Sequence, residues 1–168
     1  MILTLTGFMG SGKSCVGREL SSRLGWEFTD LDRYIEHKMG QTIPEIFKDG
    51  EERFRAIEAE AFRDLVVMSQ VTGKDIVISL GGGTITIGSA RRLILEQTTC
   101  IYLRTDLDTI FKRLGTRSKS RPLFHDKLKV EDLMDTRAPL YEMAHFTVRT
   151  DGKSPAEIAD EILGMIVR

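Results

Sequence analysis

Short runs of apolar and β-branched residues recur along the chain at intervals that leave room for a helix between them. They occupy residues 2–6, 27–29, 75–80, 99–103 and 146–149. Runs of this length, bounded by glycine and polar residues, are typical of strands whose two faces are both buried. The sequence therefore predicts a parallel sheet of five strands.

Between these runs, apolar residues recur at the helical spacing of three or four positions. The predicted helices span residues 15–24, 32–39, 43–69, 89–96, 106–114, 130–143 and 155–167. The third should break near Asp49 and Gly50, where a glycine interrupts the pattern. Alternating strands and helices favour an α/β fold, a three-layer αβα sandwich with helices on both faces of the sheet. Residues 115–129 are rich in Lys, Arg and Ser, which suits either a solvated loop or a lid over a site.

Composition narrows the function classes. A length of 168 residues is typical of one domain, which we expect to span 1–168. The 24 basic and 25 acidic residues give a net charge of −1, which argues against a nucleic-acid partner. No apolar run approaches the roughly 20 residues of a membrane span. Cys15 and Cys100 lie far apart, and we expect both to be reduced thiols in apolar settings in the cytoplasm.

The first predicted strand runs directly into a complete phosphate-binding loop. The loop reads Gly7-Phe8-Met9-Gly10-Ser11-Gly12-Lys13-Ser14. Its glycines permit backbone angles that turn N–H groups inward onto phosphate oxygens, and the next helix presents its N-terminus to the anion. Lys13 is placed to reach the β- and γ-phosphates, and the Ser14 hydroxyl to bind Mg²⁺. We therefore expect a bound nucleoside triphosphate, held by Gly10, Ser11, Gly12, Lys13, Ser14 and Cys15.

Two carboxylates, Asp30 and Asp32, follow the second predicted strand. In open parallel sheets, ligands bind at the carboxyl ends of the strands. If the chain is still extended here, both carboxylates lie on one side, near the metal and the transferred phosphoryl group. The alternative is structural, because Asp32 would also serve as the cap of a helix that begins at Arg33.

Three consecutive glycines, Gly81, Gly82 and Gly83, follow the third predicted strand. Consecutive glycines cost chain entropy, so they suit a place where a ligand or loop must touch bare backbone. The alternative is a tight turn between strand and helix. A GTPase-type loop here would carry an acidic residue for Mg²⁺, and this one does not, so metal binding must depend on Ser14 and Asp30.

Arg55 stands three residues before Glu58 on a predicted helix, a spacing that lets the two side chains pair on one face. An arginine held by a carboxylate offers a rigid fork to the carboxylate of a substrate. Taken alone, such pairs usually lie on a solvated face, and Arg137 alone reads as a surface residue. A small anionic substrate would nonetheless require two or three such arginines from different segments.

Together, these features resemble the shikimate kinase family over nearly the whole chain. The resemblance rests on the phosphate loop, the Asp30 and Asp32 pair, the stretch 49–58, the triple glycine, Arg121-Pro122-Leu123, and Arg137 with Pro139-Leu140-Tyr141. It implies a P-loop kinase fold like that of nucleoside monophosphate kinases. It also implies a mobile lid at about 115–129 and a substrate-binding helical region at about 32–62.

The resemblance further implies a reaction, in which ATP phosphorylates the 3-hydroxyl of shikimate. Asp32 would bind the ring hydroxyls and serve as the candidate base, while Glu58 orients Arg55. Asp30 would join Ser14 at Mg²⁺. The catalytic residues would be Asp32, Lys13 and Arg121, the last of which closes onto the phosphates. The substrate residues would be Asp32, Arg55, Gly81, Gly82, Gly83 and Arg137.

The adenine end departs from the family pattern. Members often carry an arginine two residues before a proline near the last helix, where this chain has Lys153 before Pro155. Lysine stacks less well than arginine on an aromatic base, so adenine contact is expected from backbone and from Arg117 or Arg113 alongside Lys153. The lid residue expected to contact the ATP phosphates is Arg121.

Two other functions stay open at this point. One is a different small-molecule kinase with the same loop, such as a gluconate or nucleoside monophosphate kinase, which would need another arrangement from Arg55, Gly82 and Arg137. The other is a non-catalytic ATP-binding module, which would leave Asp32 and the arginines without a purpose. We expect a monomer, since the sequence shows no obvious exposed apolar stripe.

Overall fold

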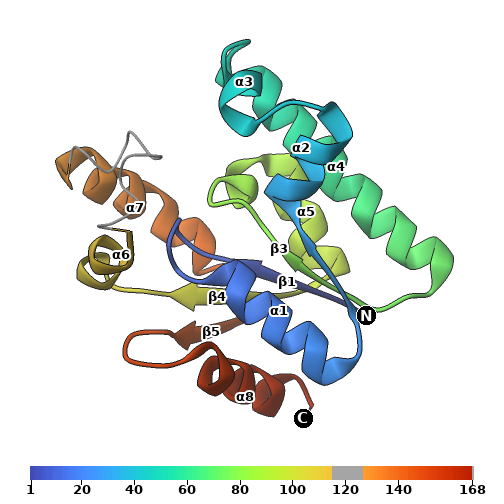
Figure 1. The fold of residues 1–168 in the computed structure, drawn as a ribbon, viewed down its shortest axis with the longest axis vertical. Helices are drawn as coiled ribbons and strands as arrows, with labels where there is room; N and C mark the ends of the chain where they lie inside the picture. Colours follow the sequence, from blue (N-terminus) through green and yellow to red (C-terminus); the bar gives the residue numbers. More distant parts are fainter. Residues whose placement is uncertain (115–126, 168) are drawn as a thin grey trace.

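The computed structural model describes residues 1–114 and 127–167 and places a parallel sheet at the centre (Figure 1). Its strands are β1 (Ile2–Thr6), β2 (Glu27–Asp30), β3 (Ile76–Ser79), β4 (Thr99–Arg104) and β5 (Phe146–Arg149). They lie in the order β2-β3-β1-β4-β5, and every neighbouring pair is parallel. The predicted five-stranded parallel sheet is confirmed.

The helices follow the predicted alternation. They are α1 (Lys13–Leu24), α2 (Leu31–Met39), α3 (Ile43–Phe47), α4 (Glu51–Thr72), α5 (Gly88–Gln97), α6 (Leu107–Leu114), α7 (Lys127–Tyr141) and α8 (Pro155–Ile166), with the short 3₁₀ helix η1 (Thr84–Thr86). The predicted break near Gly50 separates α3 from α4. Residues 127–129, assigned to the lid from sequence, form the first turn of α7.

Alternation along each strand divides the core between the two faces of the sheet. Leu3 and Leu5 of β1 belong to the cluster that α1 and α8 cover, together with Val16 and Ile158. Ile2 of β1 belongs to the opposite cluster, to which α4 and α5 contribute. Because successive side chains point to opposite faces and all five residues of β1 are buried, this strand is covered on both sides. This arrangement is the predicted αβα sandwich.

All five strands end at one edge of the sheet, and the chain leaves the central strand β1 through Gly7. Gly7 has a φ of +151°, and a Cβ there would lie 2.8 Å from the carbonyl oxygen of Leu103 at the end of β4. Only glycine therefore lets the phosphate loop pass this close to the neighbouring strand. The loop consequently begins at the middle of the sheet, because β1 lies between β3, on the side of β2, and β4, on the side of β5.

The two cysteines differ in exposure. Cys100 lies on β4 and is fully buried, and burial raises the pKa of its thiol to about 12. Cys15 is exposed, so the predicted apolar setting is wrong for this residue. The reason is its place in the first turn of α1, where the side chain faces the cleft described below and not the sheet. Both thiols are free.

The surface of α4 also departs from expectation. Val67, Met68 and Val71 are 49%, 51% and 80% exposed, although Leu65 and Val66 on the same helix are buried. The chain therefore does carry a short exposed apolar stripe, and the monomeric state stays a prediction. Over residues 1–114 and 127–167, no helix combines the length and the apolar character needed to cross a membrane.

Candidate active site

A cleft of about 1000 Å³ opens at the carboxyl edge of the sheet. Its wall combines the phosphate loop after β1, the end of β2 with the start of α2, and the triple glycine after β3. Residues from each part face it, among them Lys13, Ser14, Asp30, Asp32, Gly81 and Gly82. The topology thus brings together motifs that lie far apart in the sequence, such as Gly12 and Gly82, which are 70 positions apart.

The phosphate loop is closed on itself by Lys13. Its Nζ donates hydrogen bonds to the carbonyl oxygens of Gly7 at 2.9 Å and Phe8 at 3.0 Å, and the side chain is only 9% exposed. The ammonium is therefore held inside the loop at the N-terminus of α1, where an anion would lie. Of the predicted nucleotide-binding residues, Gly10, Gly12, Lys13, Ser14 and Cys15 line the cleft. Ser11 is buried behind it, 1% exposed.

Ser14 and Asp30 meet across the floor of the cleft. The Ser14 hydroxyl donates to Asp30 Oδ2 at 2.5 Å. The other oxygen, Oδ1, accepts from the backbone N–H of Arg33 at 3.3 Å and makes Asp30 the N-cap of α2. Asp30 therefore joins a structural role to its place beside the phosphate loop.

The position of Asp32 corrects one sequence expectation. The chain does not stay extended to Asp32, because α2 already begins at Leu31. Asp32 is also not the helix cap, a role that Asp30 fills because its extended backbone lets its side chain reach back to the N–H of Arg33. Both carboxylates nonetheless line the cleft, Asp32 from the first turn of α2.

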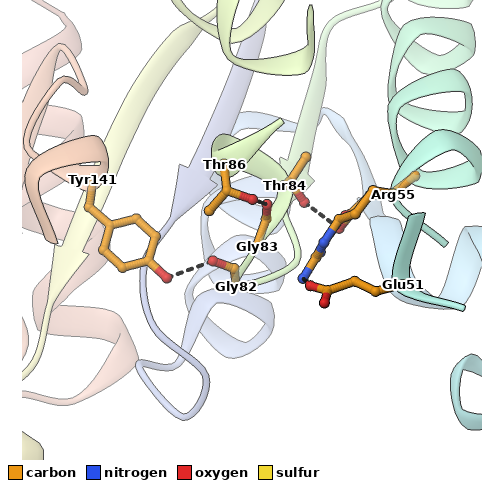
Figure 2. A network of polar contacts seen from close by, with 8 residues as sticks. Glu51, Arg55, Gly82, Gly83, Thr84, Thr86 and Tyr141 are labelled. Carbon is orange, nitrogen blue, oxygen red and sulfur yellow. Dashed lines mark hydrogen bonds and ion pairs between the residues drawn. The ribbon is translucent and has the colours of Figure 1, made fainter. Parts of the chain in front are cut away.

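Arg55 is held in place by a buried carboxylate. Its Nη1 lies 2.7 Å from Oε1 of Glu58, which is 1% exposed, while Oε2 of Glu58 accepts a hydrogen bond from the Thr84 hydroxyl at 2.7 Å. Glu51 adds a weaker ion pair at 3.5 Å (Figure 2). A buried carboxylate is stable only when its oxygens are satisfied, so Glu58 fixes the Arg55 guanidinium through a contact that cannot easily relax. The predicted pair is confirmed, and it is not a surface pair.

The triple glycine passes between these charged groups at contact distance. A Cβ on Gly81 would lie 2.7 Å from Oε2 of Glu58 and 3.1 Å from Oδ1 of Asp32. A Cβ on Gly83 would lie 2.5 Å from the nearest Arg55 nitrogens, and one on Gly82 would lie 3.4 Å from Nη1 of Arg137. Both readings of this sequence hold. Gly81 to Thr84 form a turn between β3 and η1, in which the Thr84 N–H donates to Gly81 O at 3.3 Å, and the same glycines bring bare backbone close to four charged side chains.

The carbonyl groups of the triple glycine are tied to the protein behind it. Gly82 O accepts from the hydroxyl of Tyr141 at 2.6 Å, and Gly83 O accepts from the hydroxyl of Thr86 at 2.5 Å (Figure 2). Sequence reasoning gave no role to Tyr141 or Thr84. The available signal was the spacing of Arg137 and Tyr141, one helical turn apart, but the contact itself is tertiary.

The far end of the phosphate loop meets the connection between β5 and α8. Arg113 donates to Gly10 O at 3.4 Å and to Thr150 O at 3.5 Å, and it lines the cleft. Lys153 Nζ lies 2.6 Å from Oε1 of Glu161, which draws its ammonium onto α8. Arg113 thus lies at the cleft, and its contact with adenine stays a prediction. Arg117 and Arg121 fall outside the described residues.

Comparison with known proteins agrees with the geometry of the site. The family model described as shikimate kinase matches residues 9–167. A shikimate kinase from Thermus thermophilus is 43% identical over 171 aligned residues, covering 99% of this chain and 90% of that protein. A relative of this identity over nearly the whole length shares the fold.

Solved structures give the same answer. The shikimate kinase from Acinetobacter baumannii in complex with shikimate aligns with a TM-score of 0.89 at 37% identity, covering 99% of this chain and 92% of that chain. A gluconokinase from Sinorhizobium meliloti aligns over 99% of this chain and 91% of that chain with a TM-score of 0.62 at 18% identity, which shows the shared fold alone. The chain therefore belongs to the shikimate kinase family.

Proposed function

We propose a division of labour by which this shikimate kinase transfers the γ-phosphoryl group of ATP to the 3-hydroxyl of shikimate. One observation carries it. The phosphate loop and both arginines come close to the triple glycine. A Cβ on Gly82 would lie 3.4 Å from Nη1 of Arg137 and 3.5 Å from the backbone nitrogen of Met9, and the Arg55 guanidinium packs against Gly83. A nucleotide and a small anion therefore have adjacent places at one edge of the sheet.

The acceptor carboxylate binds Arg55 and Arg137. Arg55 is 21% exposed, so its guanidinium is partly desolvated but still open to a ligand, and Glu58 holds it in one orientation. A preorganised guanidinium fork recognises a carboxylate with two parallel hydrogen bonds. Asp32, within contact distance of Gly81, then faces the ring hydroxyls. The backbone of the triple glycine completes this half of the site.

ATP binds at the other half, with its phosphates on the loop N–H groups and on Lys13. The N-terminus of α1 and the Lys13 ammonium supply positive charge where the terminal phosphates lie. Arg113 bridges the loop to the β5–α8 connection and lies beside the base. Base contacts from Arg117 and Lys153 and phosphate contact from Arg121 stay predictions, as do the lid, the monomeric state and the cytoplasmic location.

The donor set at Ser14 and Asp30 fits Mg²⁺. Both are hard oxygen donors, and they lie 2.5 Å apart at the rim of the phosphate loop. Mg²⁺ usually takes one or two protein oxygens and completes its shell with phosphates and water. That preference agrees with the described residues, which hold no group of three or more His, Cys, Asp or Glu suited to a metal. When bound, the ion would neutralise charge on the phosphates.

The transfer itself needs little covalent chemistry from the protein. The 3-hydroxyl oxygen forms a bond to the γ-phosphorus, the bond to the bridging oxygen of ADP breaks, and the hydroxyl proton passes to the Asp32 carboxylate. Positioning and charge stabilisation supply most of the rate in such reactions. Lys13 stabilises the charge that develops on the phosphates.

A panel of acceptors tests the function directly. We expect ADP release with MgATP and shikimate, and none above background with quinate, gluconate or a nucleoside monophosphate, in a coupled assay. The Lys13→Ala variant should be inactive on every acceptor, because it removes the charge that binds the terminal phosphates. Turnover with gluconate or a nucleotide in place of shikimate would contradict the assignment, and ATP binding without any turnover would favour a binding module.

Replacing Arg55 tests the carboxylate site. The Arg55→Lys variant keeps a positive charge beside buried Glu58 but loses the planar fork, so the protein stays folded while recognition weakens. The KM for shikimate should rise roughly tenfold to a hundredfold, the range expected for hydrogen bonds to a charged group, with the KM for ATP unchanged. The matched control is Arg53→Lys on the same helix, whose ion pair to Asp49 at 3.5 Å is exposed. An equal shift in both variants would refute the assignment.

Variants of Asp30 and Asp32 should differ in how their rates depend on the Mg²⁺ concentration. The Asp32→Asn variant should lower kcat by about a hundredfold to ten-thousandfold, the usual contribution of a general base, at an unchanged Mg²⁺ requirement. The Asp30→Asn variant should instead raise the Mg²⁺ concentration for half-maximal rate. Titrations of rate against Mg²⁺ measure both. Full activity in Asp32→Asn, or the same response in both variants, would show that the two roles are wrongly assigned.

A further inference from the structure

Tyr141 is a buried tyrosine that the proposed mechanism does not use. It ends α7, is 0% exposed, and stacks on Tyr102 of β4 with ring centroids 5.2 Å apart. A buried tyrosine hydroxyl needs a partner, and this one donates to the carbonyl oxygen of Gly82 at 2.6 Å (Figure 2). A polar contact therefore links this buried ring to Gly82.

Helix α7 meets Gly82 at a second point. Arg137 precedes Tyr141 by one helical turn, so both side chains lie on one face of α7. Its Nη1 would be 3.4 Å from a Cβ on Gly82. Helix α7 thus contacts Gly82 through Tyr141 and also carries Arg137, one of the two arginines proposed to bind the acceptor carboxylate. The Tyr141 hydroxyl and the Arg137 guanidinium are coupled, because both side chains belong to the same turn of α7.

Holding this carbonyl also orients the next residue. A trans peptide is planar, so the C=O of Gly82 and the N–H of Gly83 point in opposite directions. With the carbonyl directed at Tyr141, the N–H of Gly83 is directed away from α7. Gly83 is also the residue against which the Arg55 guanidinium packs. The Gly82–Gly83 peptide group therefore lies between Arg137 and Arg55, and its orientation is set by the hydrogen bond to Tyr141.

We propose that Tyr141 is a positioning residue for the acceptor carboxylate. Its hydroxyl fixes the Gly82–Gly83 peptide, which keeps Arg55 and Arg137 at the spacing that one carboxylate can bridge. This inference rests on the proposed function, since it takes the shikimate carboxylate as the shared ligand of the two arginines. Tyr141 acts through these groups and does not touch the acceptor.

Two properties make Tyr141 suited to this role. Burial raises the pKa of its hydroxyl to about 12, which favours the protonated form that donates the hydrogen bond. Stacking on Tyr102 at an interplanar angle of 26° limits the motion of its ring. Losing the hydroxyl would release the peptide to sample other orientations. Only molecules whose peptide keeps the binding orientation would bind the acceptor well, so the apparent affinity would fall in proportion to the fraction that keeps it.

The test compares Tyr141→Phe with Tyr102→Phe, which removes a hydroxyl from the other ring of the same stacked pair. Each variant is assayed with shikimate and with methyl shikimate, an acceptor whose carboxylate is blocked as an ester. Tyr141→Phe should raise the KM for shikimate about threefold to tenfold, the effect of one hydrogen bond, and leave the KM for ATP unchanged. Its preference for shikimate over the methyl ester should fall by the same factor. Tyr102→Phe should change neither.

Each outcome has one meaning. A loss confined to shikimate supports the proposal, because a purely structural defect would weaken both acceptors and the nucleotide together. Equal losses on shikimate and its ester, an unchanged KM in Tyr141→Phe, or the same loss in Tyr102→Phe would overturn it. If the wild-type enzyme does not phosphorylate shikimate, the proposed function fails, and this inference falls with it. Wild-type turnover thus separates the two failures.

Discussion

The site depends on the contact between charged side chains and bare backbone along Gly81–Gly83. A carboxylate as buried as Glu58 persists only because Arg55 and Thr84 satisfy its oxygens, and this fixes the guanidinium against Gly83. A side chain at Gly81 or Gly83 would collide with Glu58 or Arg55. The glycines cost chain entropy, but they let charged side chains from α2, α4 and α7 approach the same short segment of backbone.

The sheet supplies the convergence on which this contact relies. Parallel strands end at one edge, so the phosphate loop after β1, Asp30 after β2 and the triple glycine after β3 become neighbours without any local sequence relation. The N-termini of α1 and α2 point to the same edge, which favours anions there. Buried apolar strands thus determine where the charged residues meet, and those residues determine what binds.

The parts of this structure that the sequence predicted are those fixed by local pattern. Strand and helix periodicity placed nearly every element within a few residues, and the phosphate loop is readable because its backbone chemistry is local. Asp30 and Asp32 were assigned to the site, with a helix cap as the alternative role of Asp32. Asp30 forms that cap instead, since a shift of two residues in a helix start changes which side chain reaches the N–H. Cys15 was wrong because its exposure depends on the cleft it faces. Thr84 and Tyr141 bond to residues 26 and 59 positions away, and no local pattern encodes such contacts.

The central claim is that acceptor binding requires bare backbone beside Arg55. Gly83 has ordinary backbone angles, φ −106° and ψ 0°, so Gly83→Ala adds a methyl group without backbone strain, 2.5 Å from the Arg55 guanidinium that Glu58 holds. The most direct measurement is calorimetric titration of shikimate into this variant, with Gly88→Ala as the control, where the nearest atom is 4.0 Å away. We predict that Gly83→Ala weakens shikimate binding about tenfold or more, the effect of displacing a charged hydrogen-bond donor, while nucleotide binding stays near wild type. Thermal stability should fall, because a displaced Arg55 leaves buried Glu58 less well paired. Unchanged shikimate affinity in Gly83→Ala, or an equal loss in Gly88→Ala, would contradict the account.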